Sequence, residues 1–319
     1  MKKYTYLFIV SSLGMVAHLF SMETPTRYQI ILDTDIQCGN KTQDKIKAGH
    51  ASCIQQVIEQ TPSLHQSVVV HAGDMIDGDE YRSLFSRLCC ACIPCLKSPE
   101  QKSSEQLADF KRTFLNPLSK VPKTKVLVSP GNHEFYDATQ KALNMIKDAH
   151  GGLRYTYNLG PILVIVGAVY FDKQQRDWLE KLLNGVPQEK PLIIVNHYNA
   201  IGDHDVWYPR EDDAPLAKIL EGRNVKRLGA HNHSDYKDKW EGHDYYCGGG
   251  KEFIALNFDE LGNKISESAY LAEPQADGSY KPNPVPIPEW TQENNESDEL
   301  GEKIKRTYNK LFIDQHMFD

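Results

Sequence analysis

The amino-acid sequence predicts an α/β protein in which βαβ units build a mostly parallel sheet. Short apolar, β-like runs alternate along the chain with segments whose apolar residues recur at helical spacing. Such alternation is typical of parallel sheets rather than of all-β or all-α folds. In addition, four of the predicted strands are followed at once by polar residues, as at the carboxyl ends of strands where α/β proteins build their sites.

The composition is that of a globular protein and gives the chain no overall affinity for polyanions. The 319 residues are 40% hydrophobic and 25% charged, an ordinary balance. This length suffices for one large domain or two, with a substantial core. The net charge of −7 provides no general attraction to nucleic acid or anionic lipid. We therefore expect no sequence-specific nucleic-acid partner.

The first 21 residues differ from the rest of the chain. Met1, Lys2 and Lys3 form a basic start, and residues 6–20 are largely apolar with polar interruptions. This run is too short and too interrupted for a membrane span, which needs about 20 apolar residues. It is typical of a signal peptide, with cleavage after Ser21. We expect an exported protein, periplasmic or secreted, with no stable membrane span after cleavage; an uncleaved leader that anchors the chain is the alternative.

Strands and helices are then expected in regular alternation. The predicted strands are apolar runs, of which 162–169 is continuously apolar and therefore expected to be buried. The predicted helices carry apolar residues on one face, as Trp178, Leu179 and Leu182 show. In chain order the strands are 28–32, 68–70, 125–129, 162–169, 192–196 and 225–229, and the helices are 51–60, 107–115, 138–149, 172–183 and 214–221.

Two segments depart from this alternation. An insertion at about 81–104 carries four of the seven cysteines, Cys89, Cys90, Cys92 and Cys95. Local disulfides are the first expectation in an exported protein, membrane or lipid contact the second, and zinc the third, because four ligands so close together hardly surround one tetrahedral ion. Towards the end, the proline-rich run 282–288 predicts a stiff connector, and 297–312 has helical spacing. We therefore divide the chain into a leader (1–21), a main domain (22–272) and a connector with a terminal helix (273–319).

Four polar segments follow strand-like runs directly. They are Gly73-Asp74, Gly131-Asn132-His133-Glu134, His197, and His231-Asn232-His233. Each is weak evidence alone, since Gly-Asp is commonly a turn and a single histidine at a strand end is commonly structural. Because all four stand at equivalent strand ends, their side chains are expected to converge at one edge of the sheet. Together they form a ligand set for two divalent metals.

The residue types suit separate roles in such a site. Asp74 has two charged oxygens and can bridge two metals. Asn132 offers a carbonyl oxygen without charge, and imidazole nitrogens suit Zn, Fe, Mn or Ni. His231 and His233 point to opposite sides of an extended turn, so each can serve a different metal. His133 lies beside Asn132 and is expected to act as a general acid or to stabilise the reacting group.

The order of these segments resembles the calcineurin-like metallophosphoesterase superfamily, over about residues 28–258. Three further segments are similar to the family pattern: 157–166, 174–182 and the glycine-rich 246–250. The resemblance implies a four-layer α/β/β/α sandwich with a dinuclear metal site at the carboxyl ends of the strands. It also implies Asp74 as the bridge, with Asn132, His197 and His231 on one metal, His233 and the first motif on the other, and His133 acting beside them.

The first motif departs from the family pattern of Asp-x-His. The segment Thr34-Asp35-Ile36-Gln37 resembles an Asp-x-Gln variant, which implies Asp35 and Gln37 as ligands. A second register would use Asp33 and Asp35, so Asp35 is a ligand in both. In addition, Ala230 replaces a usual glycine, and Asp77 stands where purple acid phosphatases carry a metal-bound tyrosine. A tyrosinate–iron(III) centre is therefore not expected.

The resemblance implies a hydrolase that acts on phosphate esters. A phosphomonoesterase is favoured, in which a hydroxide held by two divalent metals (Mn, Fe, Zn or Ni) attacks phosphorus while His133 assists the leaving group. A phosphodiesterase or nucleotide pyrophosphatase is the alternative, because Asp-x-Gln is reminiscent of members that act on nucleotide diphosphate linkages. The expected substrate is a phosphorylated small molecule or nucleotide. A non-catalytic scaffold or an interaction module on the same fold is the alternative of another class.

Overall fold

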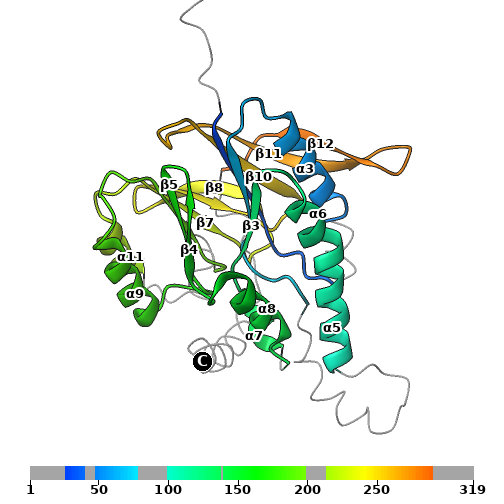
Figure 1. Ribbon diagram of the computed structural model, residues 1–319, viewed down its shortest axis with the longest axis horizontal. Coiled ribbons are helices and arrows are strands. Elements are labelled where there is room, and N and C mark those ends of the chain that lie inside the picture. Colours follow the sequence, from blue (N-terminus) through cyan, green and yellow to red (C-terminus); the bar gives the residue numbers. More distant parts are fainter. Residues whose placement is uncertain (1–25, 40–46, 78–98, 138, 199–212, 290–319) are drawn as a thin grey trace, which may run out of the picture.

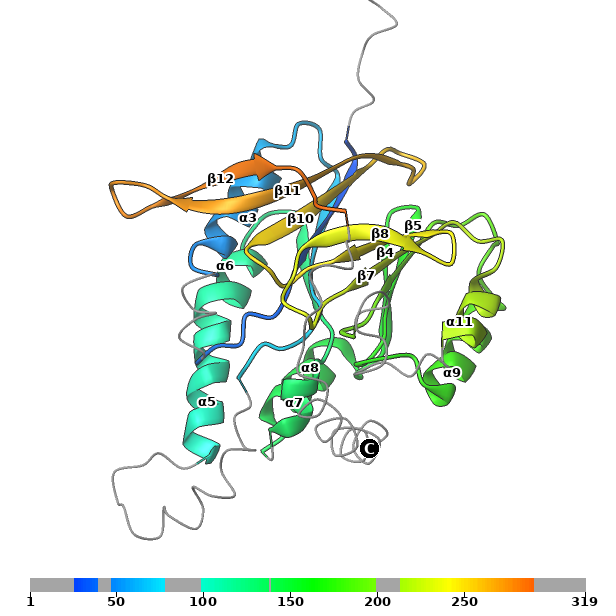
Figure 2. The same ribbon diagram turned by 180° about the vertical axis from the view of Figure 1, so that it is seen from behind.

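Two six-stranded sheets lie face to face, and helices cover the outer side of each (Figures 1 and 2). The structure is a computed structural model that describes residues 26–39, 47–77, 99–137, 139–198 and 213–289. The leader, the Cys-rich run 89–95 and the terminal helix expected at 297–312 lie outside these residues. Among the helices that are described, none combines the length and hydrophobicity that a membrane crossing requires.

The first sheet has the strand order β12-β11-β10-β1-β2-β3. Its parallel part consists of three strands whose carboxyl ends point the same way: β1 (Tyr28–Asp33), β2 (Gln66–His71) and β3 (Thr124–Val128). Its antiparallel part continues from β1 through β10 (Glu252–Phe258), β11 (Lys264–Pro274) and β12 (Tyr280–Val285).

The second sheet has the strand order β4-β5-β6-β7-β9-β8. Four neighbouring strands are parallel: β5 (Ile162–Val166), β6 (Leu192–Val195), β7 (Val225–Gly229) and β9 (His243–Cys247). The antiparallel strands β4 (Tyr155–Leu159) and β8 (Tyr236–Trp240) form its edges. Both sheets therefore present several strand ends on one side of the molecule.

Three hydrophobic clusters separate the four layers. In β1, Ile30 and Leu32 face the second sheet and Ile31 faces the helices, as the alternation of side chains along a strand requires. The helices over the first sheet are α3 (His50–Gln60), α5 (Pro99–Phe110), the π-helical turn η1 (Lys111–Leu115), α6 (Asn116–Ser119), α7 (Asn132–Tyr136) and α8 (Lys141–His150). Those over the second sheet are α9 (Lys173–Leu183) and α11 (Asp213–Leu220). The predicted four-layer α/β/β/α sandwich is confirmed.

The segment expected to be a connector is part of the first sheet. Tyr280 to Val285 form the edge strand β12, which pairs with β11 in antiparallel register. Proline lacks an N–H group and is tolerated in a sheet at such an edge. Beyond β12, the backbone N–H of Lys237 in β8 donates to the carbonyl of Pro288 at 2.8 Å. The chain from 280 to 289 thus contacts both sheets, whereas the proline-rich run was expected to be a stiff connector.

Candidate metal centre

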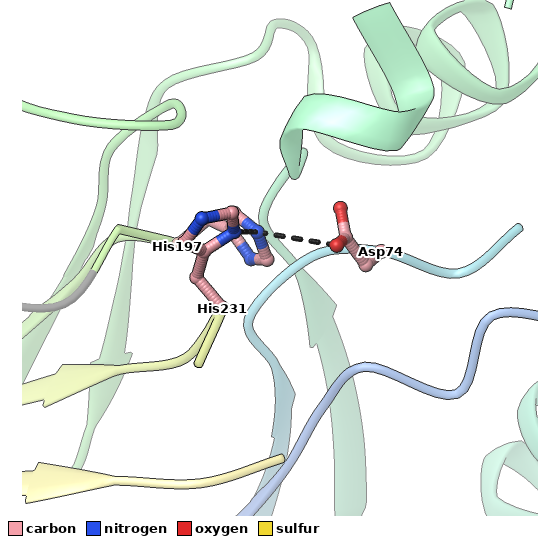
Figure 3. A group of neighbouring side chains, drawn as sticks. All are labelled: Asp74, His197 and His231. Atoms are coloured by element: carbon pink, nitrogen blue, oxygen red, sulfur yellow. Dashed lines mark hydrogen bonds and ion pairs between the residues drawn. The ribbon is translucent and has the colours of Figure 1, made fainter. Parts of the chain in front are cut away.

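The predicted polar segments come together in the loops that follow β1, β2, β3, β6 and β7. Figure 3 shows the imidazole rings of His197 and His231 next to one another, with the carboxylate of Asp74 facing them. These three residues come from the loops after β6, β7 and β2, so the convergence joins both sheets. The prediction of convergent strand ends placed each of them correctly in space, because parallel strands deliver their ends to one edge.

Asp74, His197 and His231 form one group of candidate ligands, here called the His197 group. The Nε2 atom of His197 lies 3.3 Å from Asp74 Oδ2, 3.1 Å from His231 Nδ1 and 2.9 Å from Asn132 Oδ1. On its other side, His197 Nδ1 donates to the carbonyl of Ala72 at 2.8 Å. That hydrogen bond fixes the ring so that Nε2 faces the group.

Asp35, Asp74 and His233 form a second group, here called the Asp35 group. His233 Nε2 lies 3.7 Å from Asp35 Oδ1. The side-chain amide of Gln37 reaches into this group, with its nitrogen 3.2 Å from His233 Nε2 and 3.3 Å from Asp74 Oδ2. The nitrogen and oxygen of an amide exchange places by a half-turn, so the Gln37 oxygen can occupy the same position. Asp74 belongs to both groups, as a bridging ligand would.

Five candidate ligands have left-handed backbone conformations. The φ angles are 54° for Asp35, 45° for Gln37, 57° for Asp74, 81° for His231 and 53° for His233. Such angles are uncommon outside glycine and persist only where surrounding contacts hold them. Concentrated in these loops, they indicate that the protein maintains strained backbone in order to aim these side chains.

The donor atoms fit divalent metal ions. Asp35 and Asp74 are fully buried, and among the described residues Asp35 Oδ1 is a buried oxygen without a hydrogen-bond partner. Around it and Asp74, imidazole nitrogens and an amide converge. A cation bound between these groups would compensate the two buried carboxylates. Carboxylate, imidazole and amide ligands are suited to Mn, Fe, Zn or Ni.

The charges of the site are strongly coupled. Burial raises the pKa of the Asp74 carboxyl, but the neighbouring His133 and His197 outweigh burial and hold it well below its usual value. Burial conversely lowers the pKa of His197, and Asp74 outweighs this and raises it to about 9. For His231, burial followed by the charge of His197 lowers the pKa well below the usual value. Without metal, Asp74 is therefore an anion paired with a protonated His197.

His133 lies beside the ligand groups without belonging to either. Its Nδ1 donates to the backbone carbonyl of Asp77, and its Nε2 lies 3.7 Å from Asp74 Oδ2. Its side chain is 24% exposed, whereas those of Asp74 and His197 are 1% and 0% exposed, so it can reach a bound substrate. Burial lowers the pKa of His133, but Asp74 and the Asp77 carbonyl outweigh this and raise it. Because Nδ1 donates to the Asp77 carbonyl, the second proton of a charged ring would lie on Nε2.

Glu134 organises the site, a role that the sequence did not reveal. Its carboxylate accepts hydrogen bonds from four backbone N–H groups at 2.7–3.3 Å, those of Gly131, Asp74, Met75 and Ile76. The loops after β2 and β3 are thereby tied together. The only signal in the sequence is the position of Glu134 three residues after Gly131, the spacing of a helix capping box.

Asp33 faces away from both ligand groups. Its Oδ1 lies 3.1 Å from Lys47 Nζ and 3.2 Å from His50 Nδ1. Asp33 belongs to neither candidate ligand group, whereas Asp35 belongs to one and Gln37 contacts His233 of that group. The geometry therefore supports Asp35 and Gln37, rather than Asp33 and Asp35, as the pair from the first motif. Neither Lys47 nor His50 was singled out from the sequence, since both lie in segments without a recognisable motif.

A buried cluster of carboxylates, imidazoles and amides at the strand ends of a four-layer sandwich has the composition of a divalent-metal site. The family model of the calcineurin-like phosphoesterases matches residues 29–235 of the 319. The chain therefore belongs to the calcineurin-like phosphoesterase family. Enzymes of this family generally use divalent metals, in agreement with the two ligand groups.

Solved structures with a related fold are distant in sequence. A putative 5'-nucleotidase from Staphylococcus aureus is 11% identical, with 90% of this chain and 59% of that chain covered and a TM-score of 0.44. A 5'-nucleotidase from Candida albicans is 13% identical, with coverages of 92% and 58% and a TM-score of 0.42. GAP50, the anchor in the inner membrane complex of Plasmodium, is 12% identical, with coverages of 89% and 95% and a TM-score of 0.46. The chain spans less than two thirds of both nucleotidases, and no curated protein sequence matches it significantly.

Proposed function

We propose that the protein is a phosphomonoesterase that uses two divalent metal ions. The observation that carries this proposal is the position of Asp74, whose carboxylate belongs to both the His197 group and the Asp35 group. A single carboxylate shared by two groups is what a pair of metals about 3.5–4 Å apart requires. The proposed ligands are Asp35, Gln37, Asp74, Asn132, His197, His231 and His233.

The ligands divide between the two metals by their positions. Asn132, His197 and His231 would hold one ion, and Asp35, Gln37 and His233 the other, with Asp74 between them. When bound, two such ions lower the pKa of water and neutralise the charge on a phosphoryl group. The protein supplies ligand loops whose orientation is already fixed by hydrogen bonds to Glu134 and Ala72.

His133 is the proposed proton donor. With Nδ1 engaged by the Asp77 carbonyl, the remaining proton of the charged ring lies on Nε2. Burial lowers the pKa of His133, but Asp74 and the Asp77 carbonyl outweigh this and raise it, which favours the protonated ring. From Nε2 the proton can pass to the oxygen of the departing alcohol. His133 then regains a proton from water before the next turnover.

Hydrolysis of matched aryl substrates tests the proposal. Metal-reconstituted protein is assayed against an aryl phosphate monoester and the corresponding diester, alongside Asp74→Ala and His197→Ala. We expect monoester hydrolysis that exceeds diester hydrolysis and falls at least 100-fold in both variants. Equal, negligible rates in wild type and variants with Mn, Zn, Fe and Ni would contradict an enzyme and favour a scaffold on the same fold.

A phosphodiesterase or nucleotide pyrophosphatase is the second candidate, and Gln37 is the observation that favours it. A neutral amide stands in the Asp35 group where the family pattern has histidine. The same assay separates the candidates, because faster hydrolysis of the diester than of the monoester would replace the first proposal by the second.

We also propose that the protein is exported. The proposal depends on the basic start and the apolar run of the first 21 residues. Mass analysis of the protein recovered outside the cytoplasm of its native host should show a new N-terminus near residue 22. Material that still begins at Met1 or Lys2 would instead favour an uncleaved anchor.

A further inference from the structure

We propose that Lys47 is a positioning residue that holds the ligand loop of Asp35 through Asp33, and so sets the metal affinity of the Asp35 group. This inference depends on the proposed two-metal function and concerns a residue that is not one of the proposed ligands. It concerns a buried cluster of ionisable side chains next to the metal centre and not in it.

The cluster consists of Lys47, His50 and Asp33. Lys47 Nζ lies 3.1 Å from Asp33 Oδ1, and the two side chains are 3% and 0% exposed. His50 Nδ1 lies 3.2 Å from the same oxygen, and its Nε2 lies 3.0 Å from the carbonyl of Lys251. The carboxylate of Asp33 is therefore held from two directions, by the residues that precede and begin α3.

Hydrogen bonds connect this cluster to the ligand. Asp33 Oδ1 accepts from the backbone N–H of Thr34 at 3.0 Å. The hydroxyl of Thr34 donates to Asp35 Oδ2 at 3.1 Å. Asp35 itself is in the left-handed region, at a φ of 54°, where the backbone needs external support. The fixed carboxylate of Asp33 provides that support at the start of the loop.

The far end of the same loop is held by the backbone. The N–H of Gln37 donates to the carbonyl of Asp74 at 2.8 Å, and that of Cys38 to the carbonyl of Met75 at 2.9 Å. The loop after β1 is thus aligned with the loop after β2 beyond the ligands. At the other end, the N–H of Asp35 donates to the carbonyl of Gly73 at 3.2 Å. The Asp33 cluster holds the residue before that contact, and Lys47 supplies the ammonium group of the cluster.

The charge of Lys47 also interacts with Asp35 of the Asp35 group. Burial lowers the pKa of Lys47, but the carboxylates of Asp33, Asp235 and Asp35 outweigh it and raise it. Asp235 lies in the loop that follows His233. Its carboxyl group accepts hydrogen bonds from the backbone N–H groups of Gly250 and Glu252, at 3.1 and 3.0 Å. Lys47 therefore lies among the acidic residues of both loops that supply the Asp35 group. This placement predicts an effect on one metal and not on both.

Stability alone does not explain such a pair. Replacing a buried ion pair by apolar residues is often neutral or stabilising, because removing two charges from water is costly. A pair that only stabilised the fold would moreover affect both metal groups equally. A positioning role predicts a selective loss, and that difference can be measured.

The experiment titrates metal-free full-length protein with Mn²⁺ and follows binding by electron paramagnetic resonance. Wild type should bind two ions and give the spectrum of an exchange-coupled pair. In Lys47→Met the first ion should bind within threefold of wild type and the second at least tenfold more weakly, leaving a mononuclear spectrum at two equivalents. Excess Mn²⁺ should restore both the coupled spectrum and kcat.

Lys226→Met is the matched control. Lys226 is also buried and lies 3.9 Å from an aspartate, Asp244, but it belongs to the second sheet, and its ammonium group lies 3.4 Å from the side-chain oxygen of Asn224. We expect this variant to titrate like wild type. If Lys47→Met fails to fold because Asp33 loses its ammonium partner, the double variant Lys47→Met/Asp33→Asn removes both charges and should show the same selective weakening.

Three results would overturn the inference: two unchanged affinities in the Lys47 variant, a tighter second site, or an equal weakening of both sites. A wild-type protein that binds no metal would instead contradict the proposed function. The two failures are therefore distinguishable within one titration.

Discussion

Glu134 holds Asp74 in place through the backbone, since its Oε2 accepts the Asp74 N–H at 2.8 Å. The same carboxylate accepts the N–H groups of Gly131, Met75 and Ile76. The candidate bridging ligand is therefore positioned by a residue from the neighbouring strand's loop. Metal binding at this centre depends on that loop as much as on the ligands.

Glu134→Gln should reduce both stability and metal binding. The amide keeps the size but loses one acceptor oxygen, so buried N–H groups are left without partners, at about 1–3 kcal/mol each. We expect the free energy of unfolding of the metal-free protein to fall by about 2–4 kcal/mol in urea denaturation. Glu100→Gln, whose carboxylate is 71% exposed, should change it by less than about 0.5 kcal/mol. Equal stabilities of wild type and Glu134→Gln would contradict the organising role.

Gly131→Ala should disrupt the centre by steric contact. A Cβ atom at Gly131 would lie 2.1 Å from Asp74 Oδ1 and 2.4 Å from Asp74 N, so the Asp74 loop must move. A displacement of about 1 Å at a reacting centre can reduce rates about 100-fold. We expect a loss of that size in kcat/KM together with weaker metal binding. Gly185→Ala, whose nearest atom would be 3.8 Å away, is the control that should retain activity.

Single histidine variants should remove one metal each. His231 belongs only to the His197 group and His233 only to the Asp35 group, whereas Asp74 belongs to both. After dialysis, elemental analysis should find about one metal per chain in His231→Ala and in His233→Ala, and close to none in Asp74→Ala. His243→Ala on β9 belongs to neither group and should retain two. Loss of both metals in either single histidine variant would contradict two separable groups.

His133→Asn should impair turnover without metal loss. His133 lies outside both ligand groups, and removal of a general acid typically lowers rates by about 100- to 10,000-fold. We expect a decrease of that size in kcat for an alkyl phosphate, with unchanged metal content. Because an aryl leaving group needs less protonation, the decrease should be smaller with an aryl phosphate. The same decrease with both substrates would assign His133 to binding instead of proton transfer.

His71 should make the metal-free protein less stable in acid. Burial lowers the pKa of His71 to about 4, and its ring lies beside Phe110 and Phe114. Histidine in an unfolded chain has a pKa of about 6.5. Between these values the unfolded chain binds a proton that the folded chain does not, so stability falls as pH decreases. From pH 7.5 to 4.5 this amounts to about 2–3 kcal/mol.

His71→Asn tests this contribution, because asparagine can still donate to the Asp33 carbonyl, which lies 3.0 Å from His71 Nδ1. Urea unfolding of both proteins in a chelator, at pH 7.5 and 4.5, gives the difference in stability at each pH. Wild type should lose about 2–3 kcal/mol relative to the variant on acidification. A difference that does not change with pH would show that His71 does not contribute.

The sequence located most of the candidate centre but less of the sheets. Asp74, Asn132, His197 and the His231–His233 pair each follow an apolar run, and local pattern is sufficient to place residues at strand ends. The strand β4 and the strands from β8 to β12 were not predicted. Some of these runs, such as Tyr236–Trp240, carry several charged residues and therefore lack the apolar pattern of the predicted strands. Whether such a run forms a strand depends on the neighbouring strand with which it pairs. The local sequence pattern does not reveal which segment that neighbour is.

The sequence by itself determined the chemistry of the centre: the kinds of ligand, their order along the chain and the presence of a histidine beside them. It did so because these depend on residue identity and on distance from a strand end. Only the tertiary structure decided that Asp33 faces Lys47 while Asp35 faces Asp74 and His233. The carboxylates of Asp33 and Asp35 are separated by one residue, and they differ in role because different side chains contact them. Lys47 and Asp74 lie 14 and 41 residues beyond Asp33 in the chain, so only folding brings them to these carboxylates.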